Sequence, residues 1–170
     1  MTKRVSLLLV ALVGLAAILA LALTNQRPQR TLTESAPAAA TTYGKLVIGG
    51  LNVNVTLSKH AFQVSIPPPT GGGGTGVAEF EDLTMTKPIN SSSPPLMTAR
   101  AGGQHFPTAV VTVFKSNSTK TLVRYRLTDV MVGRLHQNGN KENLSLRYEE
   151  IQMTAGGVSR CWDVGQNTTC

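Results

Sequence analysis

One sequence feature restricts the fold of this chain most. Apolar and polar residues alternate in several segments, and within two of them the apolar positions switch between odd and even numbers. In TLVRYRLTDVMV the apolar positions move from odd to even numbers between Leu127 and Val130, and in ENLSLRYEEIQMT they move from even to odd between Tyr148 and Ile151. A two-residue period indicates strands with one buried face. A one-residue slip within a strand is typical of a β-bulge, and bulges bend a sheet towards closure. The pattern therefore favours a closed antiparallel β-barrel over a flat sandwich.

Composition agrees with an all-β domain. Charged residues make up 15% of the 170 residues, while the chain contains 16 Gly and 9 Pro, a balance that favours strands and turns over helices. We expect strands in a single domain over residues 43–155. The segments are residues 43–55, 61–66, 77–87, 108–115, 121–132 and 142–154.

The N-terminus has the pattern of an export segment. Lys3 and Arg4 precede VSLLLVALVGLAAILALAL, an uncharged run over residues 5–23 that we expect to form a hydrophobic helix. Its length lies between that of a signal peptide and the roughly 20 residues of a transmembrane span. Residues 1–23 are thus predicted to be either a cleaved signal peptide or an anchor that holds the domain outside the cell membrane.

Two further segments are predicted to lack regular structure. Residues 24–42, rich in Pro, Ala and Thr without apolar periodicity, are expected to be a disordered linker. The run PPPTGGGGTG, residues 67–76, is predicted to be an exposed loop, because Pro and Gly are poor strand formers.

The two cysteines are close together near the C-terminal end of the sequence. Cys161 and Cys170 enclose WDVGQNTT, and an exported protein meets an oxidising environment. We expect one disulfide that ties down the end of a C-terminal extension, residues 156–170. A pair of free cytosolic thiols, the alternative, does not agree with export.

Charge and motifs argue against several classes of function. The net charge is +7, but beyond residue 40 there are 12 basic and 8 acidic residues. Their scatter, without interleaved aromatic residues, does not predict nucleic-acid binding. His60, His105 and His136 have no Cys or carboxylate at metal-ligand spacing. We therefore expect no metal, no cofactor and no catalytic site, and we interpret the acidic pairs in EFED and YEE as solvated.

The stretch LTMTKPINSSSPPLMTARAGGQHF interrupts the strand pattern with a short helix. Pro88 is expected to end a strand, NSSSPP to cap a helix, and PLMTARA to form about two turns before Gly102 and Gly103 stop it. His105 is expected at the helix terminus, where its partial charge would favour the helix dipole. One short helix beside the barrel follows.

These stretches together resemble the haemolysin-coregulated protein (Hcp) family, tube subunits of bacterial type VI secretion. FEDLTMTKPINSSSPPLMTARAGGQHFPTAVVTVFK is followed by YRLTDVMVGRL and ENLSLRYEEIQMT, and the resemblance extends from residue 43 to about residue 155. The residues that match the family's motif of strand end, polar turn and short helix are Thr86, Lys87, Pro88, Ser92, Ser93, Pro94, Gly103 and His105.

The resemblance implies a β-barrel with one lateral helix that assembles into rings of six copies, which stack into a tube. It implies no catalysis, and its partner is the protein itself. The export segment, the Pro-Gly loop and the C-terminal extension depart from the family pattern. We therefore expect an exported, self-associating structural protein. The alternative is a monomeric binding module of the bacterial envelope, either tethered to the membrane or secreted.

Overall fold

The structure, a computed structural model, describes residues 43–67 and 76–170. The predicted export segment, the predicted linker and most of the Pro-Gly loop lie outside these residues. Within the described ranges, the chain contains no helix with the length and apolar character needed to cross a membrane.

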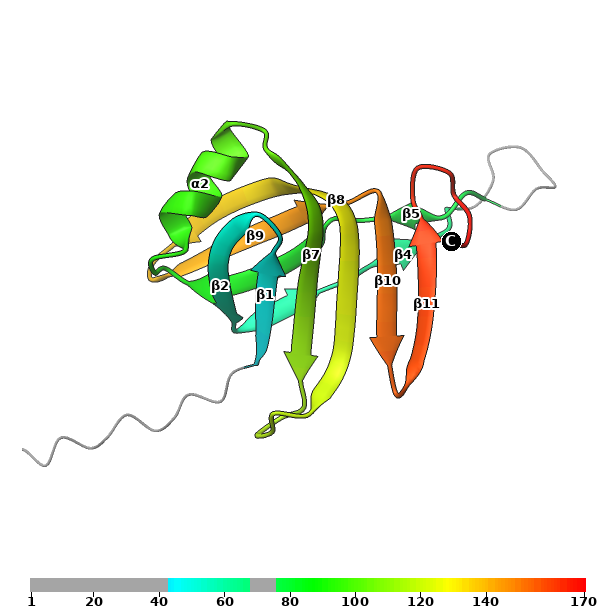
Figure 1. The fold of residues 1–170 in the computed structure, drawn as a ribbon, viewed down its shortest axis with the longest axis horizontal. Coiled ribbons are helices and arrows are strands. Elements are labelled where there is room, and N and C mark those ends of the chain that lie inside the picture. Colours follow the sequence, from blue (N-terminus) through cyan, green and yellow to red (C-terminus); the bar gives the residue numbers. More distant parts are fainter. Residues whose placement is uncertain (1–42, 68–75) are drawn as a thin grey trace, which may run out of the picture. The chain divides into compact units, whose positions relative to one another are not determined.

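A closed barrel of antiparallel strands forms the centre of the domain (Figure 1). Ladder hydrogen bonds connect its strands in the order β2-β1-β7-β8-β9-β6-β3. Only Ser58 separates β2 from β3, and its backbone N–H donates to Thr86 O at 2.8 Å. Because β2 and β3 are the two ends of this order, their continuity closes the sheet, and the predicted barrel is confirmed. The strands are β1 (Gly44–Ile48), β2 (Leu51–Leu57), β3 (Lys59–Ala61), β6 (Leu83–Pro88), β7 (His105–Phe114), β8 (Thr121–Asn138) and β9 (Lys141–Arg147).

Four strands lie outside this closed path. β10 (Glu150–Ala155) pairs with β8, and β11 (Val158–Asp163) pairs with β10. β4 (Val64–Ser65) and β5 (Glu79–Phe80) form a separate two-stranded ribbon. Three segments predicted as continuous strands are therefore divided: residues 61–66, 77–87 and 142–154. Residues 43–55, predicted as a strand interrupted by Gly-Gly, form β1 and β2.

The phase change predicted in β8 is present, but it is not a bulge. The buried side chains change parity between Leu127 and Val130, and Asp129 adopts the left-handed conformation with φ 47°. Yet the register between β7 and β8 continues unbroken from Thr108↔Thr128 to Phe106↔Val130. The buried side chains of β7 change parity at the same level. The two strands therefore bend together. The register shifts of β8 lie elsewhere, between Thr121 and Val123 in its pairing with β7 and between Val132 and Arg134 in its pairing with β9.

The second phase change marks a break between two strands rather than a bulge. β9 pairs with the second part of β8 through Met131↔Arg147, and β10 pairs with the first part through Glu150↔Thr128. The break, residues 148–149, lies beside the bend of β8. One long strand thus contributes both to the barrel and to the outer β10–β11 hairpin.

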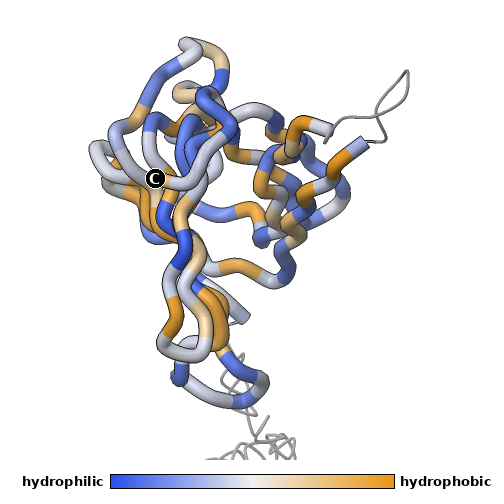
Figure 2. Tube along the Cα trace, turned by 90° about the vertical axis from the view of Figure 1, so that its right-hand side faces the viewer, coloured by the Kyte–Doolittle hydropathy of each residue, from blue (hydrophilic) through white to orange (hydrophobic). Residues whose placement is uncertain are grey.

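One apolar core fills the interior, and helix α2 (Ser93–Ala101) packs beside it. The helix buries Leu96 and Ala99 and contacts β8, as the lateral-helix prediction requires. Figure 2 shows hydrophobic and hydrophilic stretches alternating along the chain. The most completely buried apolar side chains are Leu46, Val55, Leu83, Leu96, Ala109, Val111, Val113, Leu127, Val130, Val132 and Leu146.

Candidate functional site

A buried ion pair lies at the centre of the strand-turn-helix motif. Lys87, near the end of β6, lies opposite Glu142 of β9 in the ladder, and both side chains are fully buried. The Lys87 Nζ lies 2.6 Å from Glu142 Oε2 and donates to Ser93 Oγ at 2.8 Å. Ser93 Oγ in turn donates to Glu142 Oε2 at 2.9 Å. A buried charge is tolerated when it is paired and hydrogen-bonded in this way.

The turn between β6 and α2 is held by the same group of polar atoms. The Lys87 Nζ also donates to Pro88 O at 3.1 Å. Asn90 Oδ1 accepts from the Ser92 backbone N–H at 3.0 Å and from Ser92 Oγ at 2.6 Å, and the Asn90 backbone N–H donates to Ser93 Oγ at 3.3 Å. The end of β6, the turn and the start of α2 are thereby fixed to one carboxylate on β9.

The helix N-terminus differs from the predicted serine cap. Ser92 occupies the N-cap position but makes no side-chain hydrogen bond to the helix. Its hydroxyl donates to Asn90 Oδ1 instead. Pro94 and Pro95 follow at the first turn, and because proline has no backbone N–H, fewer donors need a cap.

At the other end of α2, Gly103 agrees with its predicted role and His105 does not. Gly103 has φ +59°, a left-handed conformation that glycine adopts without strain. His105 was expected at the helix terminus, but it is the first residue of β7, and its Nδ1 lies 2.9 Å from Asp129 Oδ1. That prediction is wrong, because the partner that positions His105 is the carboxylate at the bend of β8 rather than the helix dipole.

Burial, hydrogen bonds and the charge of Lys87 shift the pKa of Glu142. Burial alone raises its pKa, but hydrogen bonds from Lys87, Gln137 and Ser93, together with the positive charge of Lys87, lower the pKa further than burial raises it. The pKa of Glu142 is therefore below its ordinary value of 4.5. The cluster stabilises the ionised carboxylate.

This pKa shift predicts a stability loss in acid. A carboxylate whose pKa is lower in the folded state stabilises the fold above its unfolded pKa, and this contribution is lost as pH falls through the folded pKa. Urea unfolding midpoints of the wild type and of Glu142→Gln should therefore differ most at neutral pH and converge as the pH falls below 4.5. A difference that stays constant down to pH 3 would contradict this prediction.

An open groove of about 900 Å³ lies on the outer face of β3, β6, β9 and the second part of β8. Its polar lining includes Thr84, Thr86 and Asn143, with Thr86 Oγ1 donating to Asn143 Oδ1 at 2.7 Å. Exposed basic side chains, among them Lys59 and Arg134, also line it. The family-motif residue Thr86 thus faces the groove, whereas its neighbour Lys87 lies in the interior.

Two acidic residues of the EFED stretch are held by polar partners. Asp82 Oδ2 accepts from Ser145 Oγ at 2.7 Å, and Arg147 lies 3.7 Å from Asp82 Oδ1. Glu81 accepts from Gln63 Nε2 at 2.9 Å. Among the described residues no group of three or more His, Cys, Asp or Glu side chains could hold a metal ion.

His60 has surroundings that the sequence did not predict. Tyr43 Oη lies 2.7 Å from His60 Nδ1, and Tyr125 Oη lies 3.5 Å from His60 Nε2. Burial lowers the pKa of His60, which favours its neutral form.

A row of ring contacts continues from Tyr125 through Phe62 and Phe80 to Trp162. Trp162 thus packs on the domain.

Comparison with known proteins assigns this arrangement to a family. A family model described as "Type VI secretion system effector, Hcp" matches residues 50–154, more than half of the chain and nearly all of the barrel. This chain belongs to the Hcp family. The resemblance inferred from its motifs is therefore confirmed.

One relative and several solved structures agree with the assignment. Protein hcp1 of Pseudomonas aeruginosa is 31% identical over 107 residues, 51% of this chain and 65% of that relative. Hcp1 from Salmonella typhimurium matches with a TM-score of 0.64 and 18% identity, over 75% of this chain and 97% of that one. Hcp1 from E. coli EAEC 042 matches with a TM-score of 0.59 and 23% identity, over 71% and 97%. At these identities the structures show a shared Hcp fold.

The contacts of this chain give three of its motif residues physical roles. The lysine supplies the buried charge, the serine joins it to the carboxylate, and the glycine lets the chain leave the helix. The resemblance identified Lys87 and Ser93 as motif residues, but the sequence did not indicate Glu142. The available signal was the alternation of β9, which places Glu142, Leu144 and Leu146 on the same inward face.

Proposed function

We propose that this Hcp family protein is a structural, non-enzymatic subunit of a type VI secretion tube that self-associates into rings. The observation that carries the proposal is the family match over residues 50–154, which contains the Lys87 cluster and all barrel strands except β1. The chain spans 65% of the length of its Pseudomonas relative. Ring assembly of this chain is therefore part of the proposal.

Physical reasoning supports rings of identical copies. The barrel strands pair with each other, so contacts between copies would use outer faces rather than barrel edges. A head-to-tail contact between two different faces gives a ring when its rotation closes. Exposed apolar side chains available on outer faces include Val47 at 50% exposure and Met97 at 59%.

The test of this function is the assembly state of the full-length protein. Sedimentation velocity over a concentration series should show a discrete species much larger than a monomer, and electron microscopy should show ring-shaped particles. Both measurements are made with and without reductant, so that any disulfide between copies is recognised separately. A strictly monomeric protein at the highest concentration under both conditions would contradict ring formation.

The proposed domain organisation has four parts, and its N-terminal segment is either cleaved or kept as a membrane anchor. Residues 1–23 are a signal peptide or anchor, residues 24–42 a linker, residues 43–155 the Hcp barrel and residues 156–170 a C-terminal extension. The alternative function, a monomeric binding module of the envelope, is favoured by the uncharged run of residues 5–23 and by the stalk-like residues 24–42 that follow it. Cell fractionation tests the tethered form of this alternative, since recovery of the protein in the medium argues against a membrane tether. The sedimentation experiment distinguishes a monomeric secreted module from a ring.

A further inference from the structure

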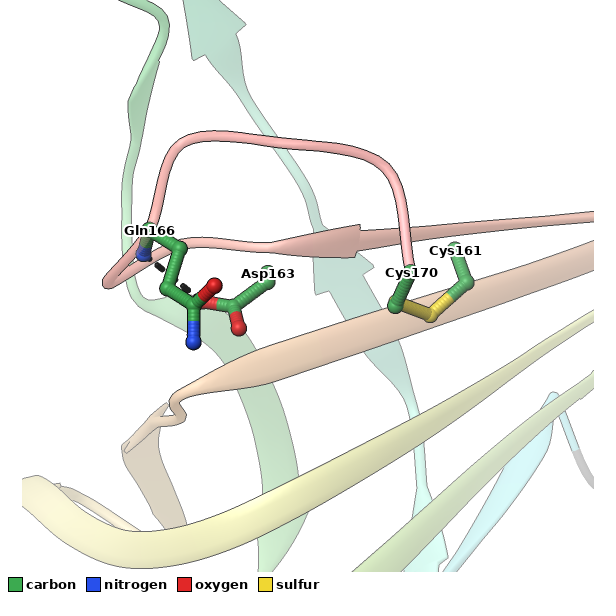
Figure 3. Close-up of a disulfide and its surroundings, with 4 residues drawn as sticks. All are labelled: Cys161, Asp163, Gln166 and Cys170. Carbon is green, nitrogen blue, oxygen red and sulfur yellow. Dashed lines mark hydrogen bonds between the residues drawn. A yellow bond between two sulfur atoms is a disulfide. The ribbon is translucent and has the colours of Figure 1, made fainter.

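The C-terminal tail occupies the open edge of β11. On its other side β11 pairs with β10. The Asp163 N–H donates to Thr168 O at 2.8 Å, and the Thr168 N–H donates to Asp163 O at 3.2 Å. This reciprocal antiparallel pair continues the register by two residues to Cys161 and Cys170, which the predicted disulfide joins with a Cα–Cα distance of 5.4 Å (Figure 3). The tail therefore lies beside the edge, held by one antiparallel bridge and the disulfide.

The turn that returns the tail to its own β11 carries two unfavourable features. Asn167 has φ 52°, in the left-handed region, which asparagine adopts more readily than other non-glycine residues but less readily than glycine. Its side-chain Oδ1 is buried without a hydrogen-bond partner within the described structure, which costs free energy. One interaction opposes these costs, because Gln166 N–H donates to Asp163 Oδ1 at 2.7 Å (Figure 3). Short turns under strain favour the exchange of a terminal segment between copies.

We propose that the edge of β11 is an interaction surface for the C-terminal tail of a second copy, and that the Cys161–Cys170 disulfide decides which tail occupies it. The oxidised bond keeps the tail on its own edge. The tail already pairs with the β11 edge of its own chain, so the tail of a second copy has the backbone that this edge can bind. A tail that arrives from a second copy does not need the turn at Asn167. This contact is separate from the ring contact proposed above.

The redox chemistry of the exchange uses a dithiol and a small disulfide. A dithiol reductant supplies two electrons and two protons, so the sulfur–sulfur bond breaks to two thiols while the reductant forms its own disulfide. Cys170 is exposed and Cys161 half-buried, which gives the reductant access. Oxidised glutathione reverses the step, because two successive thiol attacks form the new protein disulfide and release two molecules of glutathione.

The experiment uses two full-length variants that each keep one of the two cysteines. Cys161→Ser and Cys170→Ser chains are reduced, separated from the reductant, mixed and treated with oxidised glutathione, and disulfide-linked dimers are followed on non-reducing gels with a size tag on one variant. Binding of the tail raises the local thiol concentration. We therefore expect the mixed Cys161–Cys170 dimer to form on the order of tenfold faster than either like dimer.

Two proline variants of the Cys161→Ser chain provide the control. Thr168→Pro removes the N–H that donates to Asp163 O and should reduce the mixed-dimer rate to that of the like dimers. The neighbouring Thr169 N–H makes no backbone hydrogen bond to β11 in the described structure, so Thr169→Pro should leave the rate unchanged. Equal rates for mixed and like dimers, or equal effects of the two prolines, would overturn the proposal. Neither result would bear on ring assembly, which sedimentation of the oxidised protein measures, because there the disulfide keeps each tail on its own edge.

Discussion

Replacing Lys87 with methionine should lower the free energy of unfolding by about 3 to 5 kcal/mol. The substitution keeps much of the side-chain volume but removes the charge that lies 2.6 Å from Glu142. Glu142 is then a buried carboxylate without its cation, and Ser93 loses the Lys87 donor. Urea unfolding of the full chain, followed by tryptophan fluorescence and circular dichroism, measures the loss.

Two further variants test whether the loss comes from the buried ion pair rather than from the replacement of any lysine by methionine. Lys115→Met changes an exposed lysine and should alter stability by less than about 0.5 kcal/mol. The double variant Lys87→Met with Glu142→Leu should recover a large part of the loss, because no unpaired charge remains in the interior. Equal effects of Lys87→Met and Lys115→Met would show that the ion pair contributes nothing to stability.

Leu127→Ala should destabilise the protein by about 2 to 5 kcal/mol. Leu127 is fully buried on the inner face of β8, next to the bend. Truncation removes buried apolar surface and leaves a cavity that the packed neighbours fill only in part. The loss should be measurable as a lower urea midpoint with little change in the slope of the transition.

The same strand provides the matched control. Leu122 is 51% exposed, so Leu122→Ala makes the same chemical change without opening an interior cavity. It should cost less than about 0.5 kcal/mol. If the two leucine variants lost stability equally, the inner and outer faces assigned to β8 would be wrong.

The sequence predicted the features of the fold that depend on local pattern. The phase changes in residues 121–132 and 142–154 indicated bending, and the stretch from Pro88 to Gly103 indicated a short helix, because parity and turn residues are local properties. The pairing of β9 and β10 with different parts of β8 could not be predicted. It depends on contacts between strands, and residues 142–154 carry no proline or glycine that would signal the break.

The site was less predictable than the fold. Lysines near strand ends are normally exposed, and only the register that places Glu142 opposite Lys87 shows that this one is buried. The partners of His60 and His105 are equally remote in sequence, since Tyr125 and Asp129 lie on β8. The two cysteines are the exception, because their short separation and the predicted export segment together predicted the bond.

The continuity of β8 has a mechanical consequence. Residues 121–138 run without a loop from the ladder with β10 into the ladder with β9. A pulling force applied to the outer hairpin would therefore be transmitted along β8 to the barrel and would act in shear on its ladder hydrogen bonds. No flexible loop lies between the two parts of β8 to extend first. The two parts should yield together as one unit under tension.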